Sequence, residues 1–310
     1  MRGTAPSADR DGRVRVTVGN DDTLTLGVAA GGSLNATDTV LFRVSAHKHE
    51  SNGFLDNPYL GREDTKGRDE TSVRFALSFD PTDTLAGRLS VIYGRIDNFY
   101  DAFALDNSYT MLSDKPGTDA QESVGASLRL DWSDVGPGEL TLITALASSD
   151  IEFSFDADWG NDDSWAPVLY DYVSLSDRQR DTVSQELRYS TDHWLFGVYA
   201  LRLDESLATL SRGEYYDPGY DFADSLDYPF DSEYESTNLA LFTQYDTELD
   251  AKTRLAAGMR VERRTTDYRD TDGFTAGPSD TIWGGEISIS HDIGGDAMGF
   301  VALSRGFKAG

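Results

Sequence analysis

The sequence has 310 residues, 39% of them hydrophobic, and its 27 basic and 54 acidic side chains give a formal net charge of −27. A surface of this charge repels nucleic-acid phosphates, and the absence of cysteine excludes disulfides, thiolate chemistry and cysteine metal sites. No stretch comes near the ~18–20 consecutive apolar residues of a membrane helix.

Apolar and polar residues alternate along most of the chain, a period of two that predicts β-strands with one apolar and one polar face. The run from Val124 to Trp132 is the clearest, because its even-numbered positions are apolar and its odd ones polar or small. In the first half, strands are expected at residues 14–18, 24–30, 40–47, 70–79, 85–96, 123–132 and 140–153. In the second half, they are expected at 182–189, 194–203, 236–248, 254–264, 281–291 and 298–307.

The hairpin formed by residues 236–248 and 254–264 indicates what kind of strand repeats here. Leu239, Leu241 and Tyr245 lie on one side of its first limb, and Met259 and Val261 on one side of its second. Limbs of ~10 residues exceed the ~5–6 that are usual in globular sheets and match the ~9–11 that cross a bilayer. The pattern therefore favours strands that span a membrane.

From the third expected strand onward, short and long connections alternate. The long polar connections are expected at about 50–69, 97–121, 154–180, 204–235 and 269–280. A transmembrane up-and-down barrel has short turns on one side and long loops on the other, whereas sandwiches and propellers follow no such rule. The chain is therefore predicted to be all-β: an antiparallel up-and-down transmembrane β-barrel of about thirteen strands. Residues 1–12 are predicted to be a disordered or linker N-terminus, and 13–310 one barrel domain.

Aromatic residues near the ends of expected strands fit the rings of aromatic side chains that flank the apolar band of such barrels. Phe79, Trp132, Tyr189, Trp194 and Tyr245 are the candidates. The alternative is that each is an ordinary aromatic residue of a sheet.

The segment Ser304–Gly310, with Arg305, Gly306, Phe307 and Lys308, resembles a motif in the barrel of TonB-dependent outer-membrane receptors. Four further segments are similar to other stretches of that barrel: 53–62 (GFLDNPYLGR), 100–107 (YDAFALDN), 184–188 (SQELR) and 257–262 (AGMRVE). The resemblance covers almost the whole chain from about Arg13.

The resemblance implies a 22-stranded barrel in the outer membrane of a Gram-negative bacterium, with an N-terminal plug in its lumen. It also implies uptake of a scarce solute, most often a ferric siderophore, with energy delivered to the plug by the TonB complex of the inner membrane. The expected partners are therefore outer-membrane lipid, the solute and, through the plug, TonB. We expect the chain to be the front and middle of such a barrel domain, with the plug before Arg13 and about nine strands after Gly310 missing.

Two acidic and aromatic connections are the candidate binding elements. Residues 204–235 contain ten acidic residues and seven aromatic ones, and residues 153–172 have a similar character. Tyrosine and tryptophan combine a flat apolar body with a polar tip, which suits stacking on sugars or aromatic chelators. The candidate ligand contacts are Tyr215, Tyr216, Tyr220, Tyr228, Trp159 and Trp165. The alternative is that both connections are solvated surface loops kept extended by their charge.

His47 and His49 lie two residues apart on an expected strand and share a face, with Glu50 nearby. A two-histidine metal site is conceivable there, but a polar pair lining the lumen is the expected reading. No nucleophile elbow, phosphate-binding loop or metal-binding helix motif occurs, so neither an enzyme nor a cofactor is expected.

The function expected is that of an outer-membrane receptor and transporter barrel. The first alternative is a soluble or secreted all-β protein whose acidic aromatic loops bind carbohydrate or calcium. It would be monodisperse without detergent, whereas the barrel would require detergent. The second alternative is a smaller complete channel, which must close with an even number of strands.

Overall fold

The computed structural model describes residues 4–100, 103–295 and 297–306, and within them it contains strands, turns and loops but no helix. No helix of the described part is therefore long and apolar enough to cross a membrane. The predicted all-β architecture is confirmed.

Fourteen strands follow one another along the chain. Their bounds are β1 (Asp11–Val18), β2 (Leu24–Ser33), β3 (Val40–Ser51), β4 (Arg68–Thr82), β5 (Leu85–Tyr100), β6 (Gly117–Val135), β7 (Gly138–Asp156), β8 (Leu169–Ser190), β9 (Trp194–Asp217), β10 (Phe222–Asp250), β11 (Thr253–Asp270), β12 (Thr275–Ala276), β13 (Ser279–Gly294) and β14 (Ala297–Arg305).

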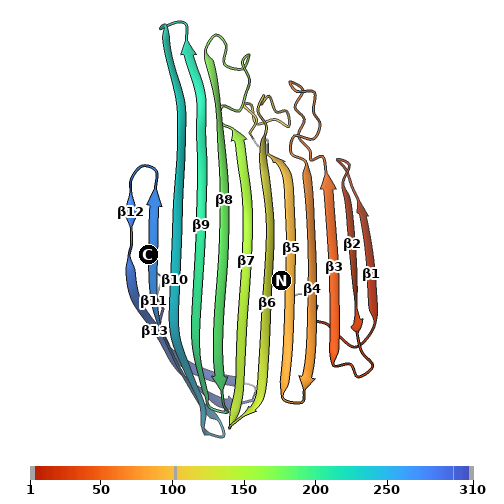
Figure 1. Ribbon diagram of the computed structural model, residues 1–310, viewed down its shortest axis with the longest axis vertical. Helices are drawn as coiled ribbons and strands as arrows, with labels where there is room; N and C mark the ends of the chain where they lie inside the picture. The colour runs from red at the N-terminus through yellow and green to blue at the C-terminus, as the bar shows by residue number, and fades with distance from the viewer. Residues whose placement is uncertain (1–3, 101–102, 296, 307–310) are drawn as a thin grey trace.

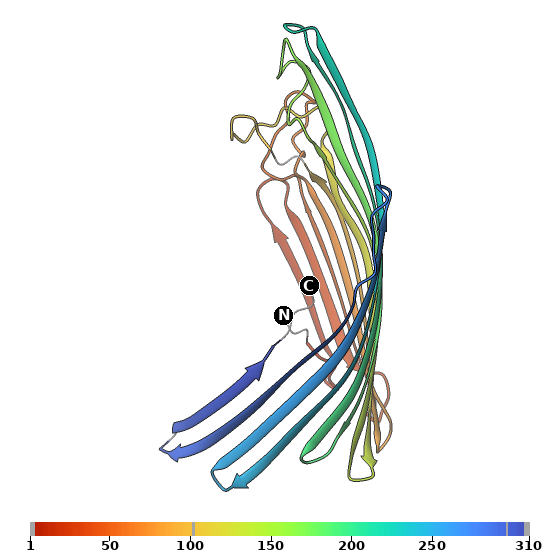
Figure 2. The ribbon, with the colours of Figure 1, turned by 90° about the vertical axis from the view of Figure 1, so that its left-hand side faces the viewer.

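All strands belong to one antiparallel sheet, in which neighbours in the chain are neighbours in the sheet except that β13 pairs with β11. The two-residue β12 pairs only with β11, so thirteen strands form the continuous path, as predicted. The sheet curves strongly (Figure 1 and Figure 2). Among the described residues β1 and β14 do not pair with each other, so the sheet remains open at both edges.

The connections separate by length, as the alternation predicts. At the lower end of Figure 1, two residues join β4 to β5, β6 to β7, and β10 to β11, and three join β8 to β9. At the upper end, residues 52–67 join β3 to β4, residues 101–116 join β5 to β6, and residues 157–168 join β7 to β8.

The prediction of a long loop at residues 204–235 is wrong. β9 continues to Asp217 and β10 begins at Phe222, and the register between them runs unbroken from Phe222↔Asp217 to Glu235↔Asp204. This hairpin, which we call the arm, reaches above most of the sheet (Figure 1). Its acidic composition indicates a loop, but its aromatic residues at even positions of β10 keep the period of two that defines a strand.

The connections at 154–180 and 269–280 are also shorter than predicted, for a similar reason. β7 extends to Asp156 and β8 begins at Leu169, so only residues 157–168 form a loop. β12 pairs with the end of β11 inside the other connection. In both places many residues are polar, so the sequence pattern predicted a loop where the backbone is paired as a strand.

The register assigns every strand residue to one of two faces. The apolar face carries a row of directly opposed residues, Leu130, Leu142, Leu187, Val198 and Leu241. The polar face, one residue along, includes Arg129, Glu186, Tyr199 and Glu262. Because cross-strand neighbours point the same way, the alternation seen in sequence becomes two chemically distinct surfaces.

Ion pairs line the polar face. Arg129 Nε lies 2.8 Å from Asp131, Arg260 Nη2 lies 2.6 Å from Glu262, and Arg188 pairs with Glu186. The guanidinium of Arg260 also lies over the ring of Tyr199, 5.3 Å from its centroid. Most of these groups remain partly exposed, so each pair contributes little stability, and together they keep this face hydrated.

Candidate functional site

Three of the upper loops pack together into what we call the loop cap: residues 52–67, 103–116 and 157–168. Asn57 is fully buried there and donates a hydrogen bond from Nδ2 to the carbonyl of Ser113 at 2.6 Å. The Thr65 hydroxyl donates a hydrogen bond to the carbonyl of Leu55 at 2.8 Å. The amide of Met111 donates one to the carbonyl of Asp56 at 2.8 Å. The described residues with fully buried side chains, Met111, Asn57, Thr65 and Ser113, all belong to this cap rather than to the sheet.

The loop cap contacts the polar face of the sheet. Tyr100 and Phe153 share that face, and their ring centroids lie 4.8 Å apart. Phe103 of the β5–β6 loop touches Tyr100 and stacks on Trp159 of the β7–β8 loop, with centroids 6.5 and 5.0 Å apart. The loops lean over the hollow side of the sheet (Figure 2), so the polar face is the hollow one.

Two neighbouring carboxylates are buried where the end of β7 meets the cap. Asp158 accepts hydrogen bonds from the amides of Tyr172 at 2.8 Å and Gly160 at 3.0 Å. Asp156 accepts one, from the amide of Asp158 at 3.2 Å. Burial and the Asp158 charge raise the pKa of Asp156 to about 7, while the Ser113 hydroxyl acts in the opposite direction. The two carboxyl groups thus have different environments, and burial favours the protonated form of the Asp156 carboxyl.

A chain of aromatic contacts runs up the polar face from the loop cap to the arm. Trp165 packs edge-on against Tyr170 with centroids 5.5 Å apart, and Tyr170 lies 6.3 Å from Tyr215. Tyr215 then contacts Phe222 at 6.1 Å. The even-numbered residues of β10 in the arm, including Tyr228, continue this aromatic surface, because they share the face of Phe222.

The six predicted ligand contacts do not form one cluster. Tyr215 and Tyr228 lie on the polar face of the arm, and Trp165 reaches Tyr215 through Tyr170. Trp159 belongs to the loop cap. Tyr216 points to the opposite face, and Tyr220 lies in the turn of the arm with 85% of its surface exposed. Whether any of them touches a ligand stays a prediction.

The sequence reasoning missed Tyr170, Tyr172 and the Asp156–Ser113 neighbourhood. The two tyrosines are spaced by two in a stretch classed as loop, and that spacing was the available signal. Asp156 ends β7 and Ser113 lies in the β5–β6 loop, and no sequence pattern predicts that the two residues are close together.

The other predicted positions are placed as follows. The guanidinium of Arg305 lies over the ring of Trp283, 3.7 Å from its centroid, and Gly306 ends the described chain. Phe307 and Lys308, like Asp101 and Ala102 of another matched segment, lie outside the described residues. His49 Nδ1 is 2.9 Å from Thr25 Oγ1, and the described residues contain no group of three His, Asp or Glu side chains able to hold a metal.

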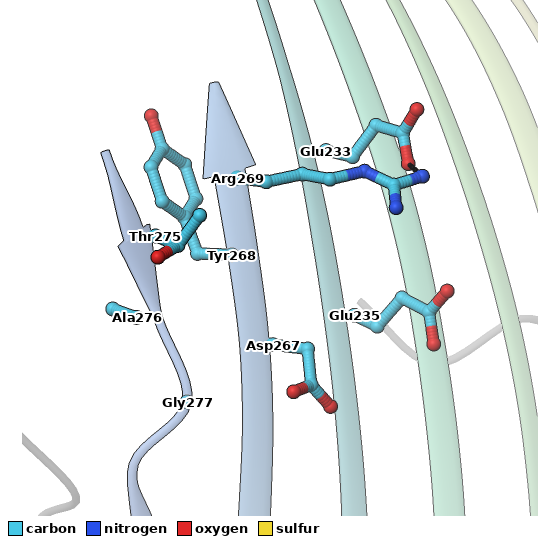
Figure 3. Close-up of a pocket in the computed structure, with 8 residues that line it drawn as sticks. All are labelled: Glu233, Glu235, Asp267, Tyr268, Arg269, Thr275, Ala276 and Gly277. Atoms are coloured by element: carbon cyan, nitrogen blue, oxygen red, sulfur yellow. Dashed lines mark hydrogen bonds and ion pairs between the residues drawn. The ribbon is translucent and has the colours of Figure 1, made fainter. Parts of the chain in front are cut away.

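A pocket of about 360 Å³ lies beside β11 and β12 (Figure 3). Its carboxylates, Glu233, Glu235 and Asp267, share the face of Leu241, and Arg269 forms an ion pair with Glu233. The pocket therefore opens on the side away from the loop cap, and it does not contribute to the aromatic surface.

No protein-family model and no characterised protein matches the sequence. Solved structures do match the fold. The ferric yersiniabactin uptake receptor FyuA from Yersinia pestis superposes with a TM-score of 0.71 and 15% identity over 96% of this chain and 47% of its own. This chain has the fold of an outer-membrane receptor barrel.

Two further matches support that assignment. The siderophore receptor PiuA from Acinetobacter baumannii has a TM-score of 0.64 and 12% identity over 97% of this chain and 50% of its own. The copper transporter OprC has a TM-score of 0.58 and 16% identity over 98% and 46%. The chain thus spans about half the length of the receptors it matches.

Proposed function

We propose that the chain forms part of the wall of a TonB-dependent receptor in the outer membrane of a Gram-negative bacterium, which takes up a scarce solute such as a ferric siderophore. One observation carries the proposal: a single curved sheet is apolar on one face, ion-paired on the other, and has its long loops at one end.

The apolar face has the dimensions of a membrane band. On β10 it runs from Tyr245 to Thr237, about 27 Å along the strand at ~3.4 Å per residue. A tilt of roughly 35–45° turns this into about 19–22 Å across the membrane, near the ~25 Å band of outer-membrane barrels. Charged residues begin directly above it, with Asp181 on β8, Arg202 on β9 and Glu235 on β10. Below it, Trp194 packs against Tyr245 with ring centroids 4.5 Å apart, which supports an interfacial ring of aromatic residues.

The apolar band crosses the register at an angle, as tilted barrel strands require. Leu26 on β2 belongs to the band and lies opposite Lys48. Following the register from Lys48 through β4, β5, β6 and β7 leads to Gln179 on β8, which is four residues above Val183 at the top of the band there. Strands tilted by roughly 35–45° against the membrane produce such a drift.

The upper end is proposed to face the outside. The arm lies above the band and carries acidic residues on its apolar-face side, where Asp227 pairs with Arg212. The pairing of β10 with β11 ends at Ser232, and Asp231 still exchanges hydrogen bonds with Thr271, directly after β11. Pro229 removes one donor from the edge beyond them. A charged edge interrupted by proline resists pairing with other strands and suits a segment exposed to water.

The polar face offers room for a plug domain. Its middle is lined by small side chains, including Ala29, Ser45, Ser127 and Ala145. Arg74 and Arg88 lie on the same face and form no ion pair with any described residue. A plug that supplies carboxylates at this wall would satisfy both charges.

The solute is proposed to bind where the loop cap meets the aromatic surface of the arm. Rings on neighbouring strands present flat apolar area with hydroxyl tips, which suits an aromatic chelate. The names of the matched receptors include a ferric siderophore and copper. Binding measurements with both kinds of solute therefore identify the metal and the chelator.

Binding and uptake assays on the full-length protein test the proposal. We expect the protein to require detergent, to bind a ferric siderophore from a panel, and to support its uptake only in cells with functional TonB. A protein that is monodisperse without detergent and binds carbohydrate or calcium would replace this proposal with the soluble binding protein.

A further inference from the structure

The β5–β6 and β7–β8 loops are joined by contacts that strand pairing does not impose. The amide of Asp114 donates to the carbonyl of Gly160 at 2.9 Å, and Asn161 Nδ2 donates to the carbonyl of Leu112 at 2.7 Å. With the stacked rings of Phe103 and Trp159, these bonds make residues 103–116 and 157–168 one unit, which we call the lid.

Asp156 lies at the end of β7, where the two halves of the lid meet. It is 5% exposed and Asp158 is 3% exposed. Asp158 accepts hydrogen bonds from two backbone amides and, at 3.4 Å, from the indole of Trp165. Asp156 Oδ2 and the hydroxyl oxygen of Ser113 are both buried, and neither meets the geometry of a hydrogen bond to any described residue. The two groups are nevertheless close enough for the Ser113 hydroxyl to lower the pKa of Asp156.

We propose that a proton held by Asp156 closes the lid. The protonated Oδ2 of Asp156 donates to Ser113 Oγ, which gives both buried oxygens a partner and ties the end of β7 to the β5–β6 loop. Loss of this proton leaves two ionised carboxylates side by side in a dry site, and the lid separates so that water reaches them.

The surrounding charges do not neutralise this pair. On the β5–β6 side, Lys115 forms an ion pair with Asp171 of β8. Asp114 adds a further carboxylate on the same side. On the β7–β8 side, Asp162 also acts on Asp114. Burial raises the pKa of Asp114 as well, so this residue is the competing source of any pH effect.

The direction in which pH changes lid opening follows from the linkage between proton binding and opening. The pKa of Asp156 is about 7 in the closed lid, and burial is its main cause. In the open lid the carboxyl is hydrated and returns toward its ordinary value, so the closed state binds the extra proton. The opening constant therefore rises about tenfold per pH unit from about pH 4 to about 7, and it is level above that.

Hydrogen exchange of the Asp114 amide measures this opening directly, because the amide is bonded across the lid. We expect its protection factor in the full-length protein to fall roughly 10²-fold between pH 5 and pH 8 and to level off near pH 7. The amide of Leu130, inside the sheet, serves as the internal reference and is expected not to change.

Three variants decide the assignment. Asp156→Asn, which is always neutral, is expected to remove the pH dependence, whereas Asp114→Asn is expected to retain it. Ser113→Ala is expected to lower protection at pH 5 about tenfold, since the closed lid loses one bond. The proposal is overturned by a flat wild-type profile, by retained pH dependence in Asp156→Asn, by its loss in Asp114→Asn, or by unchanged protection in Ser113→Ala.

Discussion

The ring of Phe242 lies across Gly197 on the neighbouring strand. A Cβ added at Gly197 would lie 2.0 Å from the ring, and the two residues are directly opposed in the register of β9 and β10. Gly87 and Phe79 form a second such pair, with a Cβ-to-ring distance of 2.2 Å. An aromatic ring that covers a strand glycine pins the register, because a shift by one residue turns the ring to the other face.

Gly197→Val is therefore expected to destabilise the sheet by about 1–3 kcal/mol, since Phe242 must leave its position or the strands must separate. Urea-induced unfolding in detergent or bilayers measures the change. Gly94→Val is the matched control, because a Cβ at Gly94 has no atom within 4 Å among the described residues. Equal destabilisation by both variants contradicts the ring contact.

If the apolar face lies against lipid, an arginine on this face of β9 should cost more stability inside the band than above it. Val198 and Tyr216 share this face of β9, the first within the band and the second high on the arm. Val198→Arg is expected to cost about 2–4 kcal/mol when the protein unfolds from a bilayer. Tyr216→Arg is expected to change stability by less than about 0.5 kcal/mol. Similar costs for the two variants would mean that the band is not where we place it.

Much of the fold follows from the sequence because a barrel strand shows its two faces as simple alternation. Leu239, Leu241 and Tyr245 predicted their hairpin, which the structure confirms. The arm was missed because composition was given more weight than period: both its faces are wet, so acidic residues replace the apolar ones that mark a spanning strand. Its turn at residues 218–221 contains Gly219, an ordinary turn residue, and this was the remaining signal.

The candidate site was less predictable than the fold. Two of the predicted residues, Trp165 and Tyr215, belong to one aromatic surface, and their contact with a ligand stays a prediction. The faces of Tyr215 and Tyr216 follow only once the arm is known to be a strand. The meeting of Asp156 with Ser113 depends on how two loops fold over the sheet, and neither loop has a repeating pattern from which this can be derived.

The integrity of the loop cap depends on Asn57. Asn57→Ala removes the buried bond to Ser113 and is expected to destabilise the cap by about 1–3 kcal/mol, with little effect on the sheet. Hydrogen exchange is expected to accelerate roughly 5- to 150-fold across residues 52–67 and 103–116, while the amides of β9 and β10 keep their rates. Uniform acceleration throughout the chain would mean that cap and sheet unfold as one unit.

Two adjacent tyrosines on opposite faces test where the solute binds. Tyr215 contacts Tyr170 and Phe222 on the polar face, whereas Tyr216 belongs to the other face and hydrogen-bonds Asp221 at 3.3 Å. Tyr215→Ala is expected to weaken binding of the proposed ferric chelate about tenfold, since a stacked ring contributes about 0.5–1.5 kcal/mol beyond its buried area. Tyr216→Ala is expected to bind as the wild type does. Titration of the full-length protein with the chelate that it takes up gives both values, and a loss confined to Tyr216→Ala would place the binding surface on the opposite side of the arm.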